Sequence, residues 1–149
     1  AEQRLTAGLI VDGIHVDPVS VRAAFMAKGA DRIALVTDAM PTVGTSLDHF
    51  ELAGRTITLS DGRLTAEGGT LAGAHLDMAS AVRNAVRLAQ LPVEDALRAA
   101  SLTPARFLGL DNERGALVPG ARADFVALTP ELTVVATWVE GSTEDLQSD

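Results

Sequence analysis

Residues 7–38 read AGLIVDGIHVDPVSVRAAFMAKGADRIALVTD and contain two apolar runs on either side of a helical pattern. The runs at 7–11 and 33–37 do not alternate between apolar and polar residues, which is typical of strands buried on both faces of a parallel sheet. Between them, Asp17 before a proline predicts the start of a helix, and Gly29 predicts its end. This order of strand, helix and strand predicts a βαβ unit with parallel strands.

The chain beyond this unit follows other patterns. Alternating stretches within residues 50–65 flank Asp61-Gly62, a dipeptide that favours a tight hairpin turn. Apolar residues at helical spacing predict a long helix over 76–89, and two shorter helices are expected after it. Two final strands are expected at 124–128 and 132–139.

Two buried parallel strands do not complete a core by themselves, because a parallel sheet needs helices on both faces or closure into a barrel. The sequence offers only two such strands and no internal repeat. It therefore predicts the end of a larger α/β protein, with an N-terminal portion that precedes these 149 residues.

The composition excludes several classes of protein. Hydrophobic residues make up 47% of the chain and charged residues 21%, a balance that excludes intrinsic disorder. The formal net charge of −8 disfavours nucleic acid, whose phosphates are bound by Lys and Arg. No apolar run reaches the length of about 18 residues that predicts a membrane span. Cysteine is absent, which excludes disulfides and thiol chemistry, and the N-terminus shows no secretory signal, so we expect a cytoplasmic location.

Two side chains that could take part in catalysis or binding follow the two predicted parallel strands. His15 follows the first strand and Asp38 ends the second. Ligands of parallel α/β proteins bind at the carboxyl ends of strands, so both residues are expected at one crevice. An aspartate there can act as a general base on a metal-bound water. The alternative is that Asp38 caps a turn and His15 is an ordinary loop histidine.

Glycines and the other histidines give weaker signals. The segment 68–73, GGTLAG, has glycines that let backbone N–H groups approach a ligand, but it lacks the Lys-Ser/Thr pair of a phosphate-binding loop. A flexible connector before the helix is the favoured interpretation. His49 and His75 are far apart in sequence and belong to no metal-binding motif, so we expect no metal ligands within this chain.

Several motifs together resemble a known enzyme family. Segments similar to N-acetylglucosamine-6-phosphate deacetylases are residues 8–17 (GLIVDGIHVD), 35–40 (LVTDAM) and 69–73 (GTLAG). Segments similar to a C-terminal signature of the wider amidohydrolase superfamily are residues 101–109 (SLTPARFLG) and 115–128 (GALVPGARADFVAL). The resemblance runs from about residue 7 to residue 141.

The resemblance implies a fold of the α/β class, namely the C-terminal part of a metal-dependent (β/α)₈ barrel together with strands of a small β-sandwich. Residues 5–11 and 33–37 are then its seventh and eighth strands. The implied organisation, given in order along the chain, is barrel at 1–109 with a β-hairpin insertion around 50–65, sandwich strands at 110–141 and a polar tail at 142–149.

The resemblance also implies roles for particular residues. Asp38 matches the catalytic aspartate of the family, which activates a metal-bound water and later protonates the departing amine. His15 matches a histidine that contacts the sugar phosphate, and Leu71, Ala72 and Gly73 match a backbone segment that lines the substrate pocket. The metal ligands of the family, a glutamate and two histidines, lie on earlier strands. A divalent metal, zinc or iron, is thus expected only in the complete enzyme.

The implied activity is hydrolysis of N-acetylglucosamine 6-phosphate to acetate and glucosamine 6-phosphate. The chain alone is expected to be inactive without the N-terminal portion. It is expected to associate either with that portion or with copies of itself. Its small-molecule partner is an amino-sugar phosphate, and neither nucleic acid nor membrane is expected. One alternative is another amidohydrolase, such as a deaminase or a cyclic amidohydrolase, although the Asp-Gly-Ile-His segment at 12–15 argues against it. A second alternative is a truncated, non-catalytic interaction module.

Overall fold

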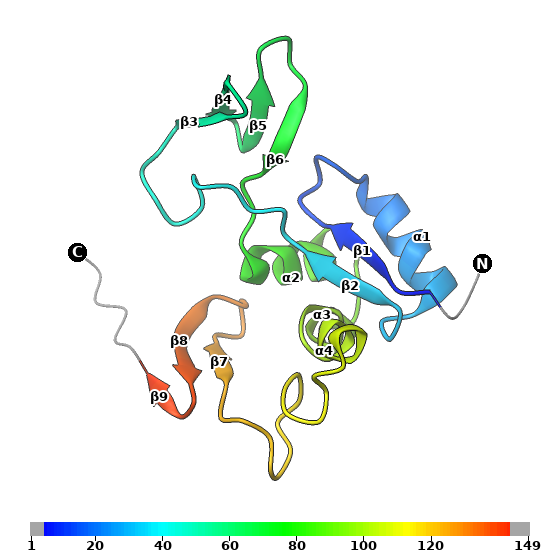
Figure 1. Ribbon diagram of the computed structural model, residues 1–149. Helices are drawn as coiled ribbons and strands as arrows, with labels where there is room; N and C mark the ends of the chain where they lie inside the picture. Colours follow the sequence, from blue (N-terminus) through cyan, green and yellow to red (C-terminus); the bar gives the residue numbers. More distant parts are fainter. Residues whose placement is uncertain (1–4, 144–149) are drawn as a thin grey trace.

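The computed structural model describes residues 5–143, which form three separate β-sheets and four helices (Figure 1). In chain order the elements are β1 (Ala7–Ile10), α1 (Pro18–Lys28), β2 (Ile33–Val36), β3 (His49–Leu52), β4 (Arg55–Ser60), β5 (Arg63–Ala66), β6 (Leu71–Ala74), α2 (Met78–Arg87), α3 (Val93–Ala100), α4 (Leu102–Leu108), β7 (Phe125–Leu128), β8 (Val134–Val139) and β9 (Ser142–Thr143). The sheet of β3–β6 and the sheet of β7–β9 lie on opposite sides of the β1–β2 unit.

The predicted βαβ unit is confirmed. Strands β1 and β2 pair in parallel, from Ala7 opposite Ile33 to Ile10 opposite Val36. Helix α1 begins where expected, because the Asp17 carboxylate accepts a hydrogen bond of 2.8 Å from the N–H of Val19, one of the donors that a helix start leaves unpaired. The helix ends at Gly29, whose φ of +76° is readily accessible to glycine.

The main core surrounds β2. Helices α2, α3 and α4 all contact this strand, and α1 covers β1 and β2 from the other side (Figure 1). The strand contributes Ile33 and Leu35, which are 1% and 2% exposed. Four of the helix positions that face the core are alanines with no exposed surface, and this small side chain lets the helices approach closely. These alanines are Ala81, Ala85, Ala96 and Ala99.

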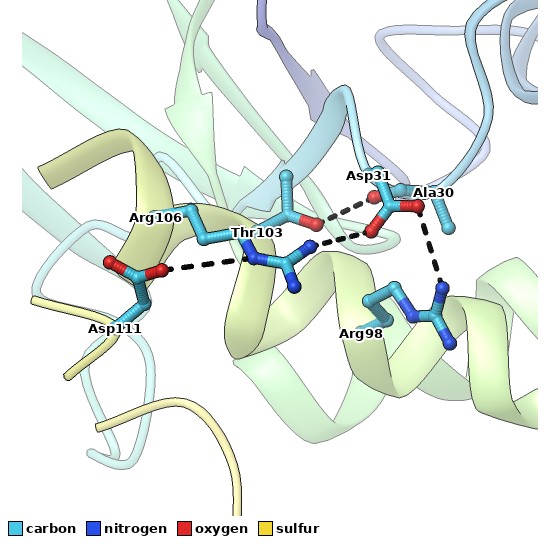
Figure 2. Close-up of polar contacts among 6 residues, drawn as sticks. All are labelled: Ala30, Asp31, Arg98, Thr103, Arg106 and Asp111. Atoms are coloured by element: carbon cyan, nitrogen blue, oxygen red, sulfur yellow. Dashed lines mark hydrogen bonds and ion pairs between the residues drawn. The ribbon is translucent and has the colours of Figure 1, made fainter. Parts of the chain in front are cut away.

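Hydrogen bonds anchor the chain just before β2 to helices α3 and α4 (Figure 2). The buried hydroxyl of Thr103 donates to the carbonyl of Ala30 at 2.6 Å. The Asp31 carboxylate accepts from Arg106 at 2.8 Å and from Arg98 at 3.5 Å. Arg106 also lies 3.9 Å from a carboxylate oxygen of Asp111. The amino end of β2 is therefore fixed by side chains from two helices.

The middle of the chain forms a four-stranded antiparallel sheet in the order β3–β4–β5–β6. The turn at Asp61 and Gly62 joins β4 to β5, and both residues have positive φ, as a tight hairpin turn requires. The sheet is larger than the predicted hairpin over 50–65, since β3 and β6 extend it at both edges. The interpretation of 68–73 as a flexible connector is wrong, because Leu71–Ala74 form strand β6.

The last sheet consists of β7, β8 and β9. The predicted strands at 124–128 and 132–139 correspond to β7 and β8, which pair antiparallel, and the ring of Phe125 stacks on Trp138 with centroids 4.5 Å apart. Of the predicted polar tail at 142–149, Ser142–Thr143 pair with β8 as strand β9, and residues 144–149 lie outside the described residues. Within residues 5–143, no helix has both the length and the apolar character to cross a membrane.

Candidate active site

Asp38 lies two residues beyond the end of β2 in an uncommon backbone conformation, with φ of +50°. A non-glycine residue in this region costs on the order of 1–3 kcal/mol, so the surrounding structure must hold it. Two backbone hydrogen bonds do so. The carbonyl of Asp38 accepts from the N–H of Ala74 at 2.9 Å, and the carbonyl of Ala74 accepts from the N–H of Met40 at 3.1 Å.

The Asp38 side chain is exposed, and its carboxylate makes no hydrogen bond or ion pair with another residue of the described segment. Its place is thus set by the backbone alone. A carboxylate that extends from a fixed backbone and has no partner among the described residues is available to a ligand or to a water molecule.

Strand β6 carries the three residues expected to line a substrate pocket, and it lies beside the segment that contains Asp38. The contact is close at Gly73, where an added Cβ would lie 2.4 Å from Cγ and Cε of Met40, and where φ is +79°. Only glycine fits there. Leu71 is 37% exposed, and Ala72 is half-buried against a small cluster that includes Met40.

His15 is held by Asp12, which follows β1. The Asp12 carboxylate accepts hydrogen bonds from the N–H groups of Ile14 at 2.9 Å and His15 at 2.8 Å. Its other oxygen lies 2.6 Å from Nδ1 of the His15 ring. Because an ionised carboxylate only accepts, Nδ1 carries the proton of this contact, and Nε2 remains for another partner.

The environment of Asp12 favours the ionised form. Its side chain is only 8% exposed, and burial by itself raises the pKa of a carboxyl group. The hydrogen bonds from the His15 side chain and from the backbone of His15 and Ile14 outweigh burial, so the pKa of Asp12 lies below its ordinary value. Asp12 was not among the candidate residues from sequence. The spacing of Asp and His three residues apart after a strand is a signal that could have identified it.

The two candidate residues follow adjacent parallel strands, because Ile10 and Val36 are paired at the carboxyl ends of β1 and β2. The side chain of Asn84 on α2 donates to the carbonyl of Val11 at 2.9 Å and so fixes the chain before His15. Within the described residues, no hydrogen bond or ion pair joins His15 to Asp38 directly. The structure therefore places them after paired strand ends at one edge of the unit.

The residues present do not form a metal centre by themselves. Among residues 5–143, no three side chains of His, Asp or Glu gather in a way that could hold a metal ion. His49 on β3 instead contacts Asp48 at 2.6 Å, and His75 contacts Thr42 at 2.9 Å. The location of the metal ligands outside this chain stays a prediction.

Comparison with known proteins identifies relatives for nearly the whole chain. The profile of the amidohydrolase family matches residues 4–143. An N-acetylglucosamine-6-phosphate deacetylase from Haemophilus influenzae is 35% identical over 136 residues, which cover 90% of this chain and 35% of that protein. An N-acetylgalactosamine-6-phosphate deacetylase from Shewanella sp. is 38% identical over 141 residues, or 95% of this chain and 36% of that protein. The chain thus spans about a third of the length of these relatives.

A solved structure agrees with these matches. The crystal structure of N-acetylglucosamine-6-phosphate deacetylase from Pasteurella multocida superposes with a TM-score of 0.93 at 34% identity, covering 96% of this chain and 38% of that chain. The family profile matches well over half of the chain, and the three relatives described above are named as deacetylases of amino-sugar 6-phosphates. The chain belongs to the amidohydrolase family.

Proposed function

We propose that this chain is the C-terminal segment of an amino-sugar 6-phosphate deacetylase and that it supplies the carboxylate that moves protons in the reaction. In this proposal β1 and β2 are the seventh and eighth strands of a (β/α)₈ barrel, and β7 and β8 belong to a small β-sandwich. The observation that carries the proposal is the exposed Asp38 carboxylate, which has a fixed backbone and no partner among residues 5–143.

The proposed reaction is hydrolysis of an acetamide. Water adds to the amide carbon, the C–N bond breaks, and acetate and a free amine leave. The Asp38 carboxylate accepts a proton from the attacking water and then donates it to the departing nitrogen, which would otherwise leave as a poor, anionic group. His15 presents Nε2 to the sugar phosphate while Asp12 holds its Nδ1. Leu71, Ala72 and Gly73 line the pocket beside Asp38.

Two sugars are candidates for the substrate. N-acetylglucosamine 6-phosphate is the substrate we favour, and the glucosamine name occurs in relatives from bacteria and mammals as well as in the Pasteurella structure. The galactosamine epimer is the second candidate, because the Shewanella relative at 38% identity carries that name. The two sugars differ at one hydroxyl group, so a direct comparison of their turnover decides between them.

We also propose that the activity needs the rest of the family domain. The Haemophilus and Shewanella relatives are about three times as long as the matched segment, and the described residues contain no ligand set for the zinc or iron that we expect in the whole enzyme. Association with that portion or with further copies of the chain, and a cytoplasmic location, stay predictions of the same kind.

The test measures release of free amine from both sugar phosphates, with metal content determined by elemental analysis. It compares the 149-residue chain with the complete domain, meaning this chain within a protein of its relatives' full length. We expect turnover only in the complete domain. In that protein, His15→Ala should impair turnover or substrate affinity and leave the metal content intact.

Two results would contradict the proposal. A monomeric 149-residue chain that holds a metal ion tightly and sustains turnover would show that the segment needs nothing else. A complete domain that binds metal but releases no amine from either sugar would favour another amidohydrolase activity or a non-catalytic role. Loss of metal from His15→Ala would show that His15 is a metal ligand.

A further inference from the structure

Thr42 is one of two fully buried polar residues among those the structure describes, with no exposed surface. It lies four residues after Asp38, in a turn where the N–H of Val43 donates to the carbonyl of Met40 at 3.0 Å. A buried hydroxyl needs a hydrogen-bond partner, and the partner of Thr42 is Nδ1 of His75 at 2.9 Å. This contact joins residues 33 positions apart and is not used by the proposed reaction.

His75 directly follows Ala74, the residue whose backbone bonds to both Asp38 and Met40. The segment 38–42 and the segment 73–75 are therefore joined by three kinds of contact. Met40 packs on Gly73, Ala74 supplies the two backbone hydrogen bonds, and His75 supplies the side-chain bond to Thr42. The last is the only one of the three that depends on polar side chains.

These contacts determine where the backbone of Asp38 lies, and with it the point from which the carboxylate extends, because the side chain has no partner of its own within the described residues and its backbone has a positive φ. If the segment 38–42 separated from β6, the backbone of Asp38 would relax and the carboxylate would move.

We propose that Thr42 and His75 are positioning residues for Asp38: their hydrogen bond holds the two segments together and keeps the carboxylate in place for proton transfer. The inference rests on the proposed function, since it assigns a purpose to the place of Asp38. The positioning role is tested separately from the activity, however, because the contact between segments 38–42 and 73–75 can be measured without any turnover.

The first test is amide hydrogen exchange at Met40 and Ala74 in the 149-residue chain. Thr42→Val removes the hydroxyl and keeps the shape of the side chain, and Thr42→Ser restores the hydroxyl. Thr103→Val is the matched control, because it removes the hydroxyl of the other fully buried threonine at the opposite end of β2. We expect faster exchange of both amides in Thr42→Val, near-parent exchange in Thr42→Ser, and no selective change at these amides in Thr103→Val.

The second test is steady-state kinetics in the complete domain. Thr42→Val should lower kcat on the order of tenfold with little change in KM, since small displacements of a catalytic group cost about that much or more. Thr42→Ser should recover most of the loss. His75→Ala, at an exposed position, should match Thr42→Val, and the double variant should be no worse than either single one, as expected for two partners of one contact.

The outcomes separate the two proposals. Unchanged exchange at Met40 and Ala74 in Thr42→Val overturns the positioning role whatever the enzyme's activity. An equal fall in kcat for Thr103→Val also overturns it, because the effect would then be general destabilisation. Selective faster exchange at these amides in the Thr42→Val chain, together with a complete domain that has no deacetylase activity, would support the positioning contact and reject the proposed function alone.

Discussion

The two ends of β2 carry the same residue type in different circumstances. Asp31 lies two residues before the strand and Asp38 two residues after it. At the amino end, the Asp31 carboxylate is engaged by Arg98 and Arg106 (Figure 2). At the carboxyl end, Asp38 has a backbone with φ of +50°, and its carboxylate has no partner in the described part of the chain. The first aspartate contributes to structure, whereas the second is kept available at a cost in conformational energy.

A buried threonine accompanies each end. Thr103 satisfies the carbonyl of Ala30 and ties α4 to the start of β2. Thr42 pairs with the side chain of His75 beside Asp38. Burial and hydrogen bonding alone therefore do not distinguish the structural end of β2 from the end with the candidate catalytic residue. The distinguishing feature is a polar group that the fold positions but leaves without a partner.

The sharpest test of this comparison replaces each aspartate by asparagine in the complete domain. Asp38→Asn keeps the shape and removes the proton acceptor, so turnover should fall by a factor of about 10² or more, the usual contribution of general acid–base catalysis. Asp31→Asn should leave turnover near that of the parent. Amine release under saturating substrate measures both. Near-normal turnover in Asp38→Asn would remove Asp38 from the catalytic role.

A second prediction concerns stability at the structural end. Thr103→Val leaves the buried carbonyl of Ala30 without a donor and should lower the free energy of unfolding by about 1–3 kcal/mol. Urea denaturation followed by circular dichroism measures the loss, and Thr103→Ser, which keeps the hydroxyl, serves as the control. An equal loss in both variants would show that packing of the methyl group, not the hydrogen bond, is responsible.

The sequence was sufficient to predict much of the fold around this strand. The apolar run before Asp38, the helix cap at Asp17 and the turn at Asp61-Gly62 are local signals, and the structure confirms each of the corresponding elements. Strand β6 was not predicted because it is short and has Gly73 at a positive φ. It is stabilised by pairing with β5 and with the backbone near Asp38, which a local pattern does not reveal.

The residues of the candidate site also divide into those that local sequence patterns predict and those that such patterns do not reveal. The position of Asp38 and His15 at strand ends follows from the order of elements, which the sequence displays directly. The Thr42–His75 contact joins segments 33 positions apart, so no local spacing marks it. Asp12 is intermediate, since its partner is three residues away but its hydrogen bonds form only when the chain turns after β1.

A third prediction is a pH dependence at the chain turn that holds His15. The pKa of Asp12 is lower in the folded protein than its ordinary value of 3.8, so the unfolded chain binds the proton more readily. The stability that the ionised Asp12 contributes is therefore fully present above pH 3.8, the pKa of the unfolded chain. It is lost as the pH falls below 3.8 and passes through the lower pKa of the folded protein. Urea denaturation between pH 6 and pH 3 should show a shallower acid decline for Asp12→Asn than for the parent. Parallel declines would show that the turn gives the ionised Asp12 no stabilisation.

The smallest effect is expected from the ion pairs of Asp31. This side chain is 53% exposed, and its partners Arg98 and Arg106 are 43% and 49% exposed, so water and salt screen the attraction. Pairs of this kind contribute about 0–1 kcal/mol, and Asp31→Asn keeps a shape that can still accept a hydrogen bond. We expect a loss of stability within that range, reduced further when salt is raised to about 1 M, where the screening length is about 3 Å. Urea midpoints at low and high salt measure it. A loss well above 1 kcal/mol that persists in high salt would mean that the Asp31 carboxylate is essential for stability. Asp31 and Asp38 would then differ only in the catalytic role proposed for Asp38.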